Sequence, residues 1–217
     1  MTLPKKKPKQ PVKGRDTKVC TFTGTTGTGK SWKANQVAQK LAKMGNNKVL
    51  VITHSGSGSS WDHCKEIAPT AKDLNFKTGW RKIVYVKHYS SKDKCFPLLE
   101  IFNHLKNCIV IFDDCKMYMR SDWEQTPGLK LICNDHRHNG LDLFFISHSP
   151  KHIPKQVWAY VGYAWIFKCG MKLQENDLDN ENAIKFIEAQ NKVNALYQKN
   201  KAQLKRKPRG ICQYITL

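Results

Sequence analysis

The chain has 217 residues, which is enough for one α/β domain with a substantial core and too few for two. Its 37 Lys and Arg against 17 Asp and Glu give a formal net charge of +20, more than solubility requires, so we expect a polyanionic partner, either nucleic acid or an anionic membrane surface; a merely basic surface is the alternative. The sequence has no apolar stretch of about 18 residues and no leader pattern, which predicts a soluble protein without a transmembrane segment. Its eight cysteines form no C-x-x-C pair, which predicts a reducing compartment and no disulfide framework.

The chain begins with a basic segment. Its first 18 residues hold seven Lys and Arg, one acidic residue and three prolines, which disfavour helix and sheet. We therefore expect a disordered basic arm over residues 1–17. Such an arm would be either an electrostatic tether to nucleic acid or to a negatively charged inner surface, or a solubilising tail.

A phosphate-binding loop follows this arm. Residues 24–31, GTTGTGKS, match the pattern G-x-x-x-x-G-K-[ST] without a mismatch. Residues 18–23 have the composition of a strand, and residues 32–44 have that of a helix, which Gly45 ends. Glycine permits the tight turn that points backbone N–H groups at a polyphosphate. The predicted nucleotide-binding residues are Gly24, Thr25, Thr26, Gly27, Thr28, Gly29, Lys30 and Ser31.

Two side chains of this loop have specific predicted roles. Lys30 is expected to reach the β- and γ-phosphates, and Ser31, just inside the helix, to place its hydroxyl on Mg²⁺. The sequence thus predicts ATP and Mg²⁺ as ligands, although no motif in it distinguishes ATP from GTP.

The next apolar runs indicate a parallel sheet. Residues 48–53 read as a strand buried on both faces. The Ser/Gly-rich residues 54–60 beyond its carboxyl end would border the nucleotide, face a polymer substrate or form an ordinary linker. Residues 82–87 predict a further strand and residues 96–105 a helix. This inserted unit is typical of additional-strand P-loop proteins, in which one strand lies between the phosphate-loop strand and the Mg²⁺ strand.

A Walker B motif is predicted at residues 108–114, CIVIFDD, where an apolar run precedes two acids. The run should form a strand next to the phosphate-loop strand. Asp113 would then emerge at its carboxyl end, to hold Mg²⁺ together with Ser31. Asp114 is the candidate general base for an attacking water.

Residues 135–150, DHRHNGLDLFFISHSP, are the second informative stretch. A short helix is expected before it, at 129–134, and a buried strand within it, at 141–146. His148 follows this strand, where a sensor residue would hydrogen-bond the γ-phosphate and the attacking water. The side chains of Cys133, His136 and His138 offer metal ligands, but their spacing fits no zinc pattern, so a loop beside a strand is the preferred interpretation.

The remainder of the chain is aromatic and then basic. Residues 157–168 predict the last core strand, with base stacking as the alternative use of their aromatic side chains. A helix is expected from Leu178 towards Gln203, with Ile184, Ile187, Val193, Leu196 and Tyr197 on one stripe. Residues 199–209 carry six positive charges and no acid, as in a DNA channel lining or a solvated tail. The apolar end at 210–217 has no predicted place.

The order of these motifs resembles the FtsK-HerA superfamily of DNA-pumping ATPases, especially the small genome-packaging NTPases of icosahedral viruses with internal membranes and the related Zot-like phage assembly proteins. The resemblance covers about Lys18 to Lys168. It implies a homo-oligomeric ring, often a hexamer, that hydrolyses ATP to move DNA into a capsid through non-specific phosphate contacts. It further implies a location in the host cytoplasm or the virion, with capsid vertex or virion membrane proteins as partners.

Carried over by position, Lys30 and Ser31 match the phosphate and Mg²⁺ residues of this superfamily and Asp113 its Walker B acid. Arg137 matches the arginine that a neighbouring subunit supplies, with Arg120 as its rival. Two positions depart from the superfamily. Glu is usual where this chain has Asp114, and Gln is common where it has His148.

The expected fold is a three-layer α/β P-loop NTPase of the additional-strand, RecA/FtsK-like type, with a mainly parallel central sheet. The predicted divisions are a basic arm at 1–17, an ATPase core at 18–175, and a C-terminal helix and basic tail at 176–217. The predicted function is a genome-packaging ATPase. A Zot-like nucleotide-dependent assembly or export factor and a P-loop nucleotide kinase are the alternatives; membrane spans are common in the former, and the kinase accounts poorly for the basic tails.

Overall fold

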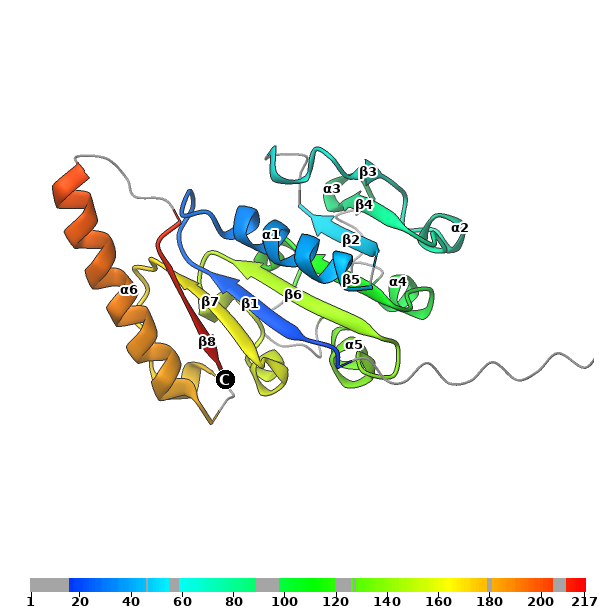
Figure 1. The fold of residues 1–217 in the computed structure, drawn as a ribbon. Helices are drawn as coiled ribbons and strands as arrows, with labels where there is room; N and C mark the ends of the chain where they lie inside the picture. Colours follow the sequence, from blue (N-terminus) through cyan, green and yellow to red (C-terminus); the bar gives the residue numbers. More distant parts are fainter. Residues whose placement is uncertain are drawn as a thin grey trace, which may run out of the picture.

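A computed structural model of the chain describes residues 16–45, 47–54, 59–88, 98–119, 126, 128–178, 181–204 and 210–217. These residues form one eight-stranded sheet with the strand order β3-β4-β2-β5-β6-β1-β7-β8 (Figure 1). All neighbouring strands pair in parallel except β7 and β8, which are antiparallel. The strands are β1 (Val19–Thr23), β2 (Lys48–Thr53), β3 (Lys65–Glu66), β4 (Gly79–Val84), β5 (Cys108–Phe112), β6 (Leu141–Ser147), β7 (Tyr163–Phe167) and β8 (Cys212–Thr216).

Helices cover both faces of this sheet, which confirms the predicted three-layer, mainly parallel α/β fold. Helix α1 (Lys30–Lys43) crosses one face through its buried alanines Ala34, Ala38 and Ala42 (Figure 1). Apolar side chains of α4 (Leu98–Asn103), α5 (Leu129–Asp135) and α6 (Ala183–Leu204) join the core cluster on the other face. The remaining α-helices are the one-turn α2 (Ala71–Leu74) and α3 (Tyr85–His88), and short 3₁₀ turns occupy Ser59–Trp61, Cys115–Met117, Pro150–His152, Lys155–Tyr160 and Glu175–Asp177.

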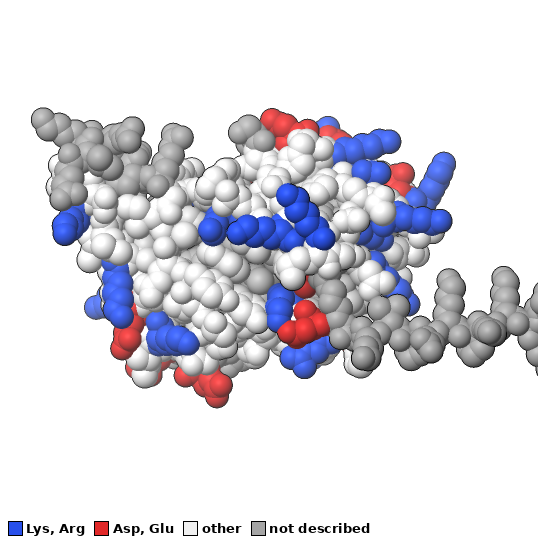
Figure 2. All heavy atoms as spheres, viewed as in Figure 1, with Lys and Arg blue, Asp and Glu red and all other residues white. Residues whose placement is uncertain are grey.

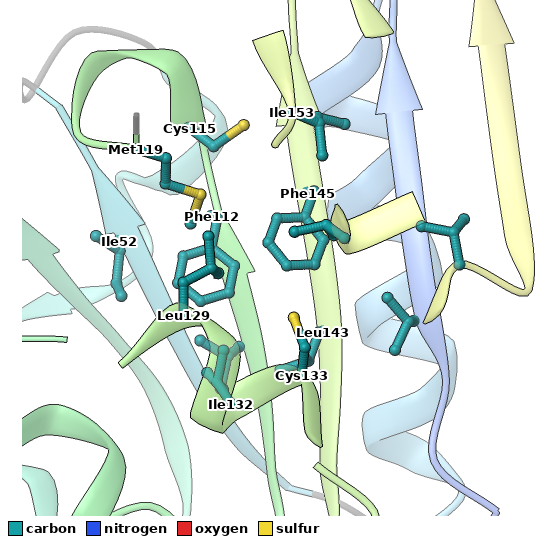
Figure 3. Close-up of a cluster of buried hydrophobic side chains, with 14 of the residues drawn as sticks. Ile52, Phe112, Cys115, Met119, Leu129, Ile132, Cys133, Leu143, Phe145 and Ile153 are labelled. Carbon is teal, nitrogen blue, oxygen red and sulfur yellow. The ribbon is translucent and has the colours of Figure 1, made fainter. Parts of the chain in front are cut away.

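Strand β5 illustrates how the two cores form. Its side chains alternate, so that Val110 and Phe112 belong to one cluster whereas Ile109 and Ile111 belong to the other. Phe112 stacks on Phe145 of β6 with ring centroids 5.0 Å apart, beneath α5 (Figure 3). Because both faces are covered, the sequence of such a strand is continuously apolar rather than alternating.

The strand order corrects one detail of the sequence interpretation. The Walker B strand β5 does not lie next to the phosphate-loop strand β1, because β6 lies between them. The fold is therefore of the additional-strand type. However, the intervening strand comes from residues 141–147, and not from the inserted unit around 82–87, whose strand β4 pairs on the far side of β2. Chain order alone does not fix which parallel strands become neighbours.

The C-terminal region also differs from prediction. Residues 155–160 form a 3₁₀ turn, so the strand expected at 157–168 is confined to β7, and β8 beyond it is the last strand of the sheet. Helix α6 begins later than expected, at Ala183. Its buried side includes Phe186, Ala189, Gln190, Val193 and Tyr197, whereas Ile184 and Leu196 of the predicted stripe are exposed. No helix in the described parts of the chain is both long and apolar enough to cross a membrane.

Candidate nucleotide site

The phosphate loop lies at the carboxyl edge of the parallel sheet, between β1 and α1. Two backbone bonds anchor its first residues: the Gly24 N–H donates to Ser147 O at 3.1 Å, and the Thr25 N–H donates to Lys168 O at 2.8 Å. A Cβ on Gly24 would lie 2.5 Å from Cβ of Phe167. This glycine is therefore required for packing against the end of β7, while Gly27 and Gly29, with φ of 78° and 99°, form the turn itself.

Lys30 is the first residue of α1, and its ammonium group points back into the loop. Its Nζ donates to Thr25 O at 3.0 Å, and the hydroxyl of Thr28 donates to the same oxygen at 2.8 Å. Only 7% of Lys30 is exposed. Burial lowers the pKa of Lys30 to about 8, against the opposing attraction of Asp113 and Asp114. The fold thus buries the Lys30 ammonium group, which is unfavourable by itself, at a position where an anionic ligand would stabilise its charge.

Ser31 and Asp113 lie in direct contact, as the sequence predicts for a Mg²⁺ pair. The Ser31 hydroxyl donates to Oδ1 of Asp113 at 3.1 Å, and the indole N–H of Trp61 donates to Oδ2 at 2.6 Å. Burial raises the pKa of Asp113, while these two hydrogen bonds oppose the rise. A hydroxyl and a buried carboxylate are hard oxygen donors of the kind that Mg²⁺ prefers, so the residues present fit this ion.

Asp114 contacts His148 across the site. Nε2 of His148 is 3.5 Å from Oδ1 of Asp114, and its Nδ1 is 3.5 Å from Nζ of Lys30 and 3.3 Å from Oγ1 of Thr26. An ammonium group can only donate, so Nδ1 must accept; the proton of a neutral His148 ring therefore sits on Nε2, facing the carboxylate. The hydrogen bond from His148 is the main reason why the pKa of Asp114 is lowered.

The backbone of Asp114 adopts an uncommon, strained conformation. Its φ and ψ are 50° and 51°, in the left-handed region that non-glycine residues rarely adopt, although Asp tolerates it better than Glu. The Tyr118 hydroxyl steadies the turn, since it lies 3.0 Å from Ile52 O and 3.1 Å from Asp113 O. Such strain is typical of functional positions.

Lys30, Ser31, Asp113, Asp114 and His148 line one cavity of about 840 Å³, within the size range of small-ligand sites. Its walls also include Trp32 from the first turn of α1, Thr53 and His54 from the end of β2, and Gly210 from the segment before β8. The loop expected at 54–60 thus contributes His54 and Ser60 to the cavity; residues 55–58 are outside the described part of the chain.

Arg137 is the predicted site residue that does not join this cluster. It lies in the turn before β6, near Asp16, while His148 follows the end of the same strand. The seven residues of β6 separate the two by roughly 20 Å. Its rival Arg120 lies outside the described residues. The alternative metal cluster also fails to form: among the described residues no three metal-ligating side chains come together, and Nδ1 of His136 donates to Cys133 O at 2.7 Å.

The fold and this geometry define a P-loop NTPase-type protein. A family model described as zonular occludens toxin (Zot) matches residues 18–215, and the chain therefore belongs to the Zot family. Among solved structures, the genome-packaging NTPase of Sulfolobus turreted icosahedral virus 2 in complex with AMPPCP is similar, with a TM-score of 0.61 and 18% identity over 82% of this chain and 86% of that one. The DNA-packaging ATPase of Sulfolobus turreted icosahedral virus is similar with a TM-score of 0.55 and 16% identity over 88% of both chains. A search of curated proteins gave no match.

Two residues that bond directly to predicted site residues were not predicted from the sequence. Trp61 donates to Asp113 from the far end of the Ser/Gly-rich loop, and Gly210 reaches the loop from the C-terminal segment, where its N–H donates to Thr28 O at 3.0 Å. Neither belongs to a motif. The position of Trp61 after a loop at the carboxyl end of a strand was a usable signal, whereas nothing in the local sequence marks Gly210.

Proposed function

We propose that this chain is a genome-packaging ATPase that works as a homo-oligomeric ring, a hexamer by its resemblance to the FtsK-HerA superfamily, and moves DNA into a capsid. The observation that carries the proposal is the meeting of Lys30, Ser31, Asp113, Asp114 and His148 in one cavity at the carboxyl edge of the sheet. The packaging NTPase of Sulfolobus turreted icosahedral virus 2, which has a similar fold, has been solved in complex with AMPPCP and with ATPγS.

The chemistry is transfer of the γ-phosphoryl group of ATP to water. The N–H groups of the loop and the Lys30 ammonium hold the phosphates and stabilise the charge on the transferring group. Ser31 and Asp113 would hold Mg²⁺, which when bound neutralises charge on the β- and γ-phosphates. Lys30 must release its bond to Thr25 O to reach them.

Asp114 is proposed to orient the attacking water and to accept its proton. The hydrogen bond from His148 lowers the pKa of Asp114, which favours the ionised carboxylate but also makes it a weaker base. Orientation is therefore its main contribution. In this arrangement His148 positions Asp114 and links it to Lys30.

Arg137 is proposed to complete the site of a neighbouring subunit. At the opposite edge of the sheet, roughly 20 Å from its own phosphate loop, it cannot reach the nucleotide held by the same chain. An arginine supplied in trans stabilises the transition state by about 10³-fold or more in rate. An isolated subunit should therefore be nearly inactive.

The proposed polymer is DNA, held by non-specific contacts with its phosphates. The net charge of +20 supports a polyanion. Figure 2 shows Lys and Arg side chains on and around α1. The sequence of α1 includes Lys33, Lys40 and Lys43. The basic segments at 1–15 and 205–209 lie outside the described residues.

Steady-state ATP hydrolysis tests this proposal. Purified protein is assayed with and without DNA at low salt, with its oligomeric mass followed and Lys30→Ala as the inactive control. We expect turnover to rise with DNA and with assembly and to fall as salt screens the phosphate contacts. Turnover that is indifferent to DNA and to assembly would rule out the motor.

Membership of the Zot family favours a second candidate, a nucleotide-dependent factor of virion assembly or export. It would use ATP binding as a switch. The same assay distinguishes the two functions, because a switch requires neither stimulation by DNA nor rapid turnover.

A further inference from the structure

Trp32 stands out because a large apolar side chain is left exposed beside a polar site. It is 58% exposed on the first turn of α1, yet it lines the same cavity as the phosphate loop and the two acids. The two residues before it both bond within the site, Lys30 to Thr25 O and Ser31 to Asp113. An aromatic face at such a position is suited to stacking.

The proposed binding of the phosphates would place the nucleoside near this residue. The γ-phosphate end of the site is fixed by Lys30, Asp113 and Asp114, and the helix N-terminus cradles the phosphates nearer the sugar. The nucleoside attached to the α-phosphate must therefore lie near the first turn of α1. Trp32 is the third residue of that helix.

The C-terminal segment at residues 210–212 lies beside the first turn of α1. Gly29 and Trp32 are three residues apart and share one side of the first turn. Gly210 approaches that side, since a Cβ on Gly29 would lie 3.6 Å from the Gly210 nitrogen. Burial raises the pKa of the Cys212 thiol and the charge of Lys33, the next residue of the turn, opposes this rise, so Cys212 lies near Lys33. Residues 210–212 thus run past the turn that carries Trp32.

We infer that the indole of Trp32 stacks on the base of the nucleotide, beside the backbone at Gly210. This inference rests on the proposed nucleotide function of the loop. The ligand class is a nucleoside triphosphate. A π-face reads shape and polarisability rather than the donors and acceptors of a base edge, so this platform accepts adenine and guanine alike.

The test distinguishes binding of the base from binding of the phosphates. Dissociation constants of Mg–ATP, Mg–GTP and Mg–tripolyphosphate are measured for the wild-type protein, Trp32→Ala, Trp32→Phe and Met44→Ala. Met44, 82% exposed at the other end of α1, is the matched control. We expect Trp32→Ala to weaken ATP and GTP binding about ten- to a hundredfold, by loss of base stacking, and to leave tripolyphosphate binding unchanged. Trp32→Phe should retain most of the affinity and Met44→Ala all of it.

Several results would overturn the inference. Equal weakening of ATP and tripolyphosphate by Trp32→Ala would show damage to the loop, and no weakening of either would leave Trp32 without a role in binding. A lower oligomeric mass with unchanged affinities would make Trp32 a contact between subunits. If the wild-type protein binds tripolyphosphate but binds ATP no more tightly, the base site fails while the phosphate loop stands; if it binds neither, the proposed function fails as well.

Discussion

Lys30 holds its charge in a largely buried position, and the consequence is a nucleotide affinity that depends on pH. Its pKa of about 8 lies below the ordinary value because burial disfavours the ammonium form. Bound phosphates favour that form, so binding takes up a proton above pH 8. The dissociation constant of ATP should therefore rise above pH 8, by at most about tenfold per pH unit. Titrations from pH 7 to pH 10 measure this rise, and Lys30→Met, which binds weakly throughout, should not show it.

His148 and Asp114 form the second residue-scale prediction. His148→Ala removes the main bond that lowers the pKa of Asp114, so that pKa should rise and the acid limb of the pH profile of kcat should move to higher pH. We expect turnover at pH 7 to fall about tenfold or more. His148→Gln should keep the acid limb and the turnover close to those of the wild-type protein, because an amide can donate to Asp114 and accept from Lys30. His104→Gln, at an exposed position directly after α4, is the control. An acid limb that does not move in His148→Ala would contradict this role.

At the scale of elements, the phosphate loop depends on the strand ends on either side of it. Gly24→Ala would press a Cβ against Phe167, so we expect a loss of roughly 1–3 kcal/mol in the free energy of unfolding. At Gly27 a Cβ would meet open space, so Gly27→Ala should cost only the strain of its positive φ, about 1 kcal/mol. Denaturant unfolding of both variants measures the difference, and equal losses would argue against the packing role of Gly24.

Helix α6 is tied to the loop through a short relay. The Asn194 side chain accepts from the Cys169 N–H at 3.0 Å and donates to Cys169 O at 2.8 Å, next to the Lys168 carbonyl that anchors Thr25. Asn194→Ala should cost roughly 1–3 kcal/mol of stability because both backbone groups lose their partner. It should also weaken ATP binding. Asn191→Ala, an exposed asparagine on the same helix, should change neither quantity; unchanged ATP affinity in Asn194→Ala would show that α6 does not support the loop.

At the scale of the whole molecule, the C-terminal region belongs to the nucleotide site. Strand β8 extends the central sheet, Gly210 bonds the phosphate loop, and α6 supports the residues after β7. The predicted division at residue 175 remains a prediction. These contacts nevertheless link the region beyond it, with its basic segment, directly to the loop.

Local patterns were sufficient for much of this molecule. Both P-loop motifs, the buried strands around them and the closeness of Ser31 to Asp113 could be predicted, because a short motif fixes a strand, a turn and a helix together. The position of β6 between β5 and β1, the pairing of β8 and the contact of Trp61 with Asp113 could not. Each depends on residues far apart in the chain, about which a local pattern carries no information.

The most direct test of a site shared between subunits uses two inactive variants. Lys30→Ala lacks the lysine that is proposed to bind the phosphates but keeps Arg137. Arg137→Ala keeps the phosphate loop but lacks the arginine. We expect each variant alone to lose ATP hydrolysis stimulated by DNA, and a mixture of the two to recover part of it, because some interfaces then combine an intact loop with an intact arginine. A mixture that stays inactive although mixed rings form, or an Arg137→Ala variant that hydrolyses ATP at the wild-type rate, would contradict this account.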